Sequence, residues 1–153
     1  MKRHPALYQL SHDHHQGLIL AQQLKKGTPQ YKGMPSTLEG KKEYAISLYR
    51  TELVKHFEDE EKILFPSVIK RDDEVDKLIE EVISEHRKME SLVKDLMRKS
   101  DVTDLLDELG RLLEKHIRKE ERKLFPKIEE ILSEGELKTI GKKLISSRGS
   151  EKK

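Results

Sequence analysis

The chain has 153 residues, of which 39% are charged and 34% hydrophobic, and it contains no cysteine. This length suits one domain, and the absence of cysteine excludes a disulfide scaffold and protein thiolate chemistry. Lys and Arg total 31 against 29 Asp and Glu, a net charge of +2, so the composition does not indicate nucleic-acid binding. No apolar run approaches the length of a membrane span, and no apolar segment follows the basic N-terminus. We therefore expect a cytoplasmic protein with no membrane partner.

Two helices are predicted in the N-terminal half of the chain. Apolar residues at 3.6-residue spacing predict the first from Pro5 to Lys26, because proline suits a first turn and Gly27-Thr28-Pro29 ends it. A loop rich in Gly and Pro follows. Ser36 or Thr37 can cap the second helix, and Pro66 should kink or end it.

Three more helices are predicted in the C-terminal half. They span about Asp72–Lys99, about Ser100–Leu132 and, more briefly, about Gly135–Ile145, with a frayed polar tail after them. Four long helices with short connections predict an all-α fold, an antiparallel up-down-up-down four-helix bundle with a short fifth helix at its C-terminal end. We expect residues 1–146 to form this domain and residues 147–153 to form the tail.

Histidines and glutamates interrupt the apolar faces of the four long helices. Each helix has one such histidine, and the second and fourth helices add a glutamate four residues later; the six residues are His14, His56, Glu60, His86, His116 and Glu120. Since residues i and i+4 lie on the same helix face, each His–Glu pair can reach one centre. The pairs belong to an internal repeat: residues 56–66 (HFEDEEKILFP) and 116–126 (HIRKEERKLFP) share H, E, E, L, F and P at the same positions.

A pair of divalent cations explains these residues. Buried imidazoles and carboxylates without partners each cost several kcal/mol, so they need a ligand. The four histidines would be terminal ligands, and Glu60 and Glu120 would bridge the two ions. Such a set suits two non-heme iron ions, Fe2+ or Fe3+, with manganese or zinc as alternatives. Coordination positions stay open for an oxo or hydroxo bridge and for a small molecule.

Several neighbouring residues are secondary candidates. His15, Glu90 and Glu121 are further candidate metal ligands, although a surface position is the simpler interpretation of each. Glu61 and Glu121 directly follow the paired glutamates, and we expect them to face solvent and form i,i+4 contacts. A lone histidine on an apolar face is usually a satisfied core residue, but four at equivalent positions on four helices argue against that interpretation.

The chain resembles the hemerythrin-like family of HHE cation-binding domains over about residues 5–132. The resemblance rests, in chain order, on Asp13-His14, on His56-Phe57-x-x-Glu60-Glu61 with Leu-Phe-Pro, on Glu85-His86, and on His116-x-x-x-Glu120-Glu121 with Leu-Phe-Pro. It implies a four-helix bundle around a non-heme di-iron centre. In that family such centres bind O2, sense O2, iron or redox state, or take part in nitric oxide and peroxide responses.

Two positions depart from the oxygen-carrying hemerythrins. Their third helix has a second histidine one turn after the first, where this chain has Glu90, and their fourth helix uses an aspartate at i+5, where this chain has Glu120 at i+4. A set with more carboxylate should favour oxidised iron and weaken reversible O2 carriage. Family members that repair iron–sulfur clusters often carry a cysteine-containing segment, which this sequence lacks.

The resulting hypothesis is a di-iron protein that binds or senses O2 or another small oxidant, nitric oxide or peroxide. One alternative is a di-iron oxidoreductase that reduces peroxide or nitric oxide with electrons from a redox partner protein. Others are an iron or metal storage protein and a purely structural helical module. The sequence assigns no oligomeric state.

Overall fold

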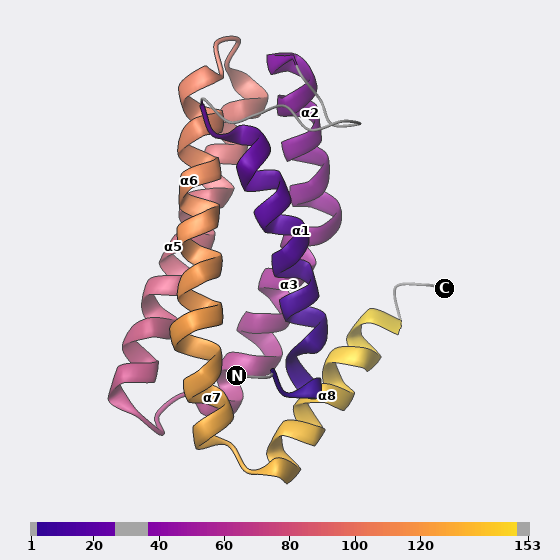
Figure 1. The fold of residues 1–153 in the computed structure, drawn as a ribbon, viewed down its shortest axis with the longest axis vertical. Helices are drawn as coiled ribbons and strands as arrows, with labels where there is room; N and C mark the ends of the chain where they lie inside the picture. The colour runs from indigo at the N-terminus through magenta and orange to yellow at the C-terminus, as the bar shows by residue number, and fades with distance from the viewer. Residues whose placement is uncertain (1–2, 27–36, 150–153) are drawn as a thin grey trace.

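The computed structural model describes residues 3–26 and 37–149, which are helical along almost their whole length (Figure 1). The first helical stretch begins with a 3-10 turn, η1 (Pro5–Leu7), and continues as α1 (Tyr8–Leu24). The Ala6 N–H donates to His4 Nδ1 at 2.9 Å and so caps the turn. The first predicted helix is thus confirmed, whereas the predicted loop and the Ser36 cap lie outside the described residues.

The second helical stretch alternates between α-helical and wider π-helical turns. Thr37 caps it, since its hydroxyl accepts from the Gly40 N–H at 3.0 Å. Helical backbone continues through Pro66, because the Phe65 N–H bonds to the Glu60 carbonyl five residues back and this wider turn precedes the proline. The segments are α2 (Leu38–Leu48), η2 (Tyr49–Leu53), α3 (Val54–Asp59), η3 (Glu60–Leu64) and α4 (Phe65–Val68).

The C-terminal half follows the predicted order of helices. Asp72 caps the third stretch by accepting from the Val75 N–H at 3.0 Å. The prediction that the chain frays from Ser146 is wrong for residues 146–149, which are helical. Within residues 3–26 and 37–149 the structure has no strand. The helices are α5 (Asp73–Arg98), α6 (Thr103–Lys119), η4 (Glu120–Leu124), α7 (Phe125–Ile131) and α8 (Glu134–Gly149).

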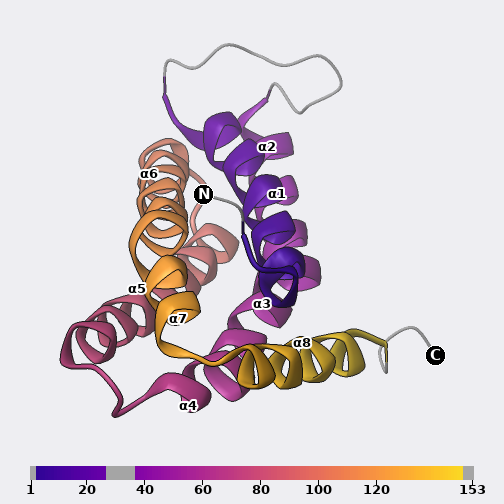
Figure 2. The same cartoon turned by 60° about the horizontal axis from the view of Figure 1, so that its bottom comes forward.

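The long helices pack side by side, and α8 crosses one end of them, against η1 and η3 (Figures 1 and 2). The α1 and α6 helices approach closely where glycines lie between them: a Cβ built on Gly110 would come within 2.9 Å of the Ala21 carbonyl oxygen. Glycine at this position therefore permits a short distance between the two helix backbones.

Two apolar clusters form the core, and a polar layer lies between them. Each of the four long helical stretches contributes buried side chains to both clusters. The first cluster includes Leu7, Leu10, Leu64, Val82, Leu124 and Phe125, and the second includes Leu20, Leu53, Phe57, Met89, Leu113 and Ile117. The layer that separates them contains the histidines that interrupt the apolar faces.

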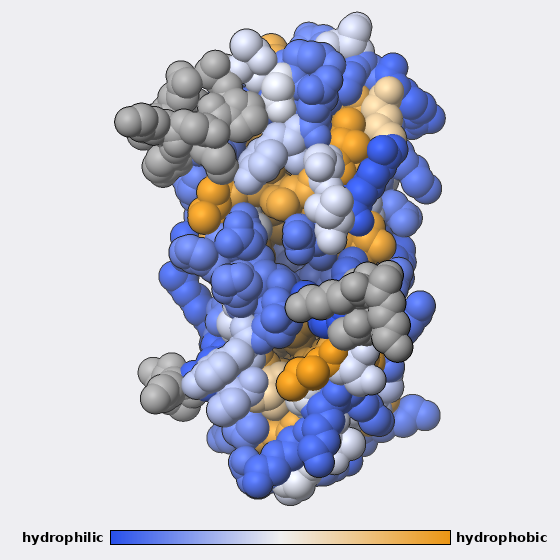
Figure 3. All heavy atoms as spheres, turned by 90° about the vertical axis from the view of Figure 1, so that its right-hand side faces the viewer, coloured by the Kyte–Doolittle hydropathy of each residue, from blue (hydrophilic) through white to orange (hydrophobic). Residues whose placement is uncertain are grey.

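The surface is mostly hydrophilic, as the face in Figure 3 shows, with separate apolar patches. Ile145 on α8 is the most exposed of the large hydrophobic side chains that the structure describes, at 74%. None of the described helices is both long enough and apolar enough to span a bilayer.

Candidate metal centre

Six polar side chains meet in the layer between the two apolar clusters. Each is at most 3% exposed. They come from α1, α3, η3, α5, α6 and η4 and are, in that order, His14, His56, Glu60, His86, His116 and Glu120. These are the residues that the sequence predicts as metal ligands, and the structure brings all six together.

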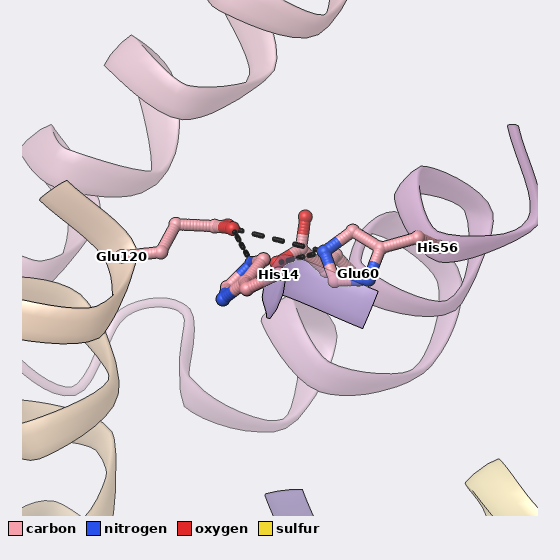
Figure 4. Close-up of side chains that lie close together, drawn as sticks. All are labelled: His14, His56, Glu60 and Glu120. Carbon is pink, nitrogen blue, oxygen red and sulfur yellow. Dashed lines mark hydrogen bonds and ion pairs between the residues drawn. The ribbon is translucent and has the colours of Figure 1, made fainter. Parts of the chain in front are cut away.

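The six residues form two groups that share both glutamates. Ligand atoms of His14, His56, Glu60 and Glu120 all lie within 4.8 Å of one another, and so do those of His86, His116 and the same two glutamates. Figure 4 shows the first group, with the two imidazoles and the two carboxylates pointing toward one another. A carboxylate that belongs to both groups is the arrangement that bridging two cations requires.

Most of the atoms that point into this centre form no hydrogen bond with the residues that the structure describes, although His86 Nε2 lies 3.1 Å from Glu60 Oε1 and His56 Nε2 lies 3.3 Å from Glu60 Oε2. They are buried, and they include Nε2 of three histidines, both carboxylate oxygens of Glu60 and Oε2 of Glu120; the histidines are His56, His86 and His116. His14 Nε2 is the exception, at 2.7 Å from Glu120 Oε1. Leaving buried polar atoms unpaired costs free energy, which bound cations would remove. Imidazole nitrogen and carboxylate oxygen are suitable donors for iron, manganese or zinc, so the residues fit a metal centre.

A second set of carboxylates lies behind the imidazoles. Each histidine donates its Nδ1–H to an acid from the preceding long helical stretch, and the set closes into a ring because the last stretch supports the first. The contacts are His56 to Asp13 at 2.9 Å, His86 to Glu61 at 2.7 Å, His116 to Glu85 at 2.7 Å and His14 to Glu121 at 2.6 Å. Because a carboxylate accepts at Nδ1, each imidazole in its neutral form presents the Nε2 lone pair to the centre.

These contacts correct part of the sequence interpretation. The expectation that Glu61 and Glu121 face solvent is wrong, since both bond to ligand-type histidines. Glu121 lies behind His14 and outside the two donor groups. His15 is exposed, and Glu90 Oε1 lies 4.0 Å from Lys94 Nζ. Neither of these secondary candidates belongs to the two donor groups.

Each carboxylate of the ring also meets a cation. Arg148 Nη2 lies 2.6 Å from Asp13, Arg3 Nη2 lies 3.1 Å from Glu121 and Lys119 Nζ lies 2.6 Å from Glu85, while Arg87 pairs with Glu61. The negative charge behind each imidazole is therefore balanced on its outer side. These ion pairs hold the carboxylates in place.

The pKa values reflect the same opposing charges. Burial lowers the pKa of His56, but Glu60, Asp13 and Glu120 outweigh it and leave that pKa well above the usual value. Burial raises the pKa of Glu60, yet the neighbouring histidines and Glu120 hold it well below the usual value. For Asp13, hydrogen bonds from His56 and Arg148 overcome burial and lower the pKa to about 2. Without metal, these shifts favour a protonated His56 imidazole beside ionised Glu60 and Asp13 carboxylates.

Two phenylalanines cover the imidazole faces. Phe57 stacks on His86 with ring centroids 3.9 Å apart and an interplanar angle of 18°, and Phe125 stacks on His14 at 5.3 Å and 23°. Phe125 belongs to the second Leu-Phe-Pro segment. These rings restrict both imidazole orientation and water access.

Sequence reasoning missed the supporting residues, although the sequence contains a signal for four of them. Asp13 and Glu85 each precede a predicted ligand histidine, and Glu61 and Glu121 each follow a predicted ligand glutamate. Four acids that each adjoin a predicted ligand indicate a shared role. Arg148 has no such signal, because it lies in the segment that composition predicts as a frayed tail.

Comparison with known proteins supports the metal interpretation. The family model described as the hemerythrin HHE cation binding domain matches residues 6–128, most of the chain. Searches among curated proteins and among solved structures each found no similar protein. The match covers the ligand-type histidines and glutamates and the acids that support them. By this match, the chain belongs to the hemerythrin HHE cation-binding domain family.

Proposed function

We propose that this protein holds two non-heme iron ions and binds or senses a small oxidant: O2, nitric oxide or peroxide. The observation that carries the proposal is the pair of buried donor groups that share Glu60 and Glu120. In this assignment, two histidines would bind each ion as terminal ligands and the two glutamates would bridge the ions. Iron would supply redox chemistry and open coordination positions for the small molecule.

The residues of the chain hold and shield this centre. The carboxylate ring orients the imidazoles, and the two glutamates balance half the charge of two divalent ions. Six protein ligands for two ions leave positions open, and apolar clusters on both sides limit water around them. A small uncharged oxidant suits such a buried centre better than a charged or bulky substrate, because entering it costs little desolvation.

The order of the apolar clusters along the chain supports an antiparallel up-down-up-down bundle. The first helical stretch runs from the first cluster to the second, and the next stretch returns from Ala45 in the second to Val68 in the first. From Val75 to Leu96 the chain crosses to the second cluster, and from Leu106 to Ile128 it returns again. Every crossing passes through the polar layer once.

Metal analysis and spectroscopy test the proposal together. Protein purified without chelator should contain about two iron ions per chain. The reduced, iron-loaded protein should develop charge-transfer absorption on exposure to air, as a bridged diferric centre does. A single stoichiometric change indicates a binder or sensor, whereas continued consumption of peroxide or nitric oxide with a reductant would indicate an oxidoreductase. A fully folded protein that takes up no metal would contradict the proposal.

A further inference from the structure

The two halves of the centre obtain their outer cations from different parts of the molecule. We name His14 and His56 the first half-site and His86 and His116 the second half-site. The acids behind the second half-site pair with Arg87 on α5 and Lys119 on α6, two long helices of the bundle. The acids behind the first half-site pair instead with Arg3, before η1, and Arg148, on α8.

The internal repeat shows where this difference arises. The repeat offset of 60 residues makes Asp59 the counterpart of Lys119, so an acid occupies the position that supplies the cation in the second half-site. Asp59 is only 1% exposed. It accepts from Arg148 Nε at 2.7 Å and from Ser147 Oγ at 3.0 Å, and Lys55 Nζ lies 3.5 Å away. Asp59 thus holds Arg148 of α8, and Arg148 supplies the cation behind His56.

The Arg148 guanidinium links two buried acids. Its Nε bonds to Asp59, and its Nη2 bonds to Asp13 Oδ2 at 2.6 Å. The same Asp13 oxygen accepts the Nδ1–H of His56 at 2.9 Å. A rigid guanidinium with several donors can satisfy two carboxylates at once, which a lysine ammonium or a water molecule does less well.

Loss of the guanidinium would release this chain of contacts. Asp13 is 7% exposed. It would keep the hydrogen bond from Gln9 Nε2 at 3.1 Å but would lose its charged partner on α8. Without the guanidinium, the Asp13 carboxylate loses the donor that fixes the oxygen to which His56 bonds. A less firmly held carboxylate orients the His56 imidazole less well, and removal of such an outer partner typically costs about 10–100-fold in metal affinity.

We propose that Arg148 is a positioning residue for the first half-site, and that α8 holds that half-site through Asp59, Arg148, Asp13 and His56. This inference rests on the metal-binding function proposed above. It makes the two metal positions inequivalent: the first depends on the docking of α8, and the second depends on the long helices alone.

Variants with one half-site each provide the test. His86→Ala leaves the first half-site intact, and His14→Ala leaves the second. Arg148→Gln is added to each, and Co2+ affinity is measured by competition with a coloured chelator. We expect Arg148→Gln to lower affinity about tenfold in the His86→Ala protein and less than about twofold in the His14→Ala protein. Lys119→Gln is the matched control and should show the reverse pattern.

A second measurement keeps all six ligands. Zn2+ is titrated into the full chain while imidazole nitrogen NMR signals are followed. With Arg148→Gln, the signals of His14 and His56 should shift at higher Zn2+ concentration than in the parent chain, with His86 and His116 unchanged. Arg148→Lys should fall between the two, because an ammonium reaches only one of the two acids well.

The outcomes separate this inference from the proposed function. Equal losses at both half-sites, or none at either, would overturn the positioning role of Arg148 while leaving the metal centre standing. Failure of the parent chain to bind Co2+ or Zn2+ at all would overturn both. Circular dichroism of each metal-free variant establishes that the helical fold is retained.

Discussion

Each of the four central histidines has two nitrogen atoms in opposite surroundings. Nδ1 donates a hydrogen bond to a carboxylate from another helical stretch, and Nε2 faces the shared glutamates. The acid therefore selects the tautomer, and the packed phenylalanine rings restrict rotation of His14 and His86. Neighbouring glutamates consequently have different roles: Glu60 lies in both donor groups, whereas Glu61 supports an imidazole from behind.

Substitution of these two glutamates should separate the two roles. We expect Glu60→Gln to reduce bound metal sharply, because a charged ligand leaves both donor groups. Glu61→Gln, the matched control, should retain both metals and weaken affinity by about 10–100-fold. Metal content after gel filtration measures the first effect, and chelator competition measures the second. Indistinguishable metal content and affinity in the two variants would contradict the assignment.

Metal binding should depend on pH in a defined direction. Burial lowers the pKa of His14 and His86, but their carboxylate partners outweigh it and raise both above the ordinary 6.5. Since a metal binds the neutral imidazole, protons compete, so affinity should fall as the pH is lowered through these raised values. Without metal, the free energy of unfolding depends on pH in the opposite direction. The stability that the protonated imidazoles contribute is fully present below pH 6.5, and it is lost as the pH rises through the raised pKa of the folded state. Proton release on metal addition, followed with an indicator dye, measures the first effect, and constant affinity across this range would contradict it.

At the scale of elements, a π turn begins at each shared glutamate. The Phe65 N–H bonds to the Glu60 carbonyl and the Phe125 N–H bonds to the Glu120 carbonyl, each five residues back. Proline follows in both cases and disfavours a regular α turn before it. Pro66 predicts an irregular helical turn at this position, but the sequence does not distinguish a widened turn from a kink. Such turns occur frequently at functional sites, and here they coincide with the two shared glutamates.

The contact between α1 and α6 yields a test of packing that does not involve metal. Gly110→Ala would place a Cβ 2.9 Å from the Ala21 carbonyl and 3.0 Å from the Leu24 Cβ. We expect it to lower the free energy of unfolding by about 1–3 kcal/mol, since backbone has to move. Gly135→Ala is the control, with its nearest atom at 4.0 Å, and should be neutral or slightly stabilising. Urea unfolding of the metal-free variants measures both; equal stability of the two would show that α1 and α6 are not closely packed here.

At the scale of the whole molecule, the polar layer divides the hydrophobic core. Apolar clusters lie on both sides of six buried polar side chains, several of whose atoms lack partners among the described residues. In a domain of this size, that layer reduces the stability of the metal-free fold. Bound cations would join all four long helical stretches at their middle and restore it.

Removing the metal should therefore lower the melting temperature. A ligand present at 100 times its dissociation constant stabilises a fold by about 2.7 kcal/mol, which corresponds to about 5–10 °C for a chain of this length. Thermal unfolding of the iron-loaded protein with and without a chelator measures the difference. An unchanged melting temperature would favour the structural helical module.

The sequence alone determines the helical class, the approximate helix bounds and the six residues that converge. Hydrophobic periodicity identifies the face that each residue occupies, so a polar residue on an apolar face is predicted to be buried. The repeat then relates the two His–Glu pairs. The identity of the bound metal and the role of the six residues as its ligands stay predictions.

Only the tertiary structure decided which partners stand behind those six residues. Glu61 and Glu121 lie at the edge of an apolar face, where periodicity favours solvent, and contact with a neighbouring helix partly buries them instead. Arg148 is more than 130 positions from Asp13 along the chain and bonds to it because α8 folds back across the bundle. Helix periodicity is a local property with a repeat of a few residues, whereas these contacts depend on how separate helices pack, which no local pattern encodes.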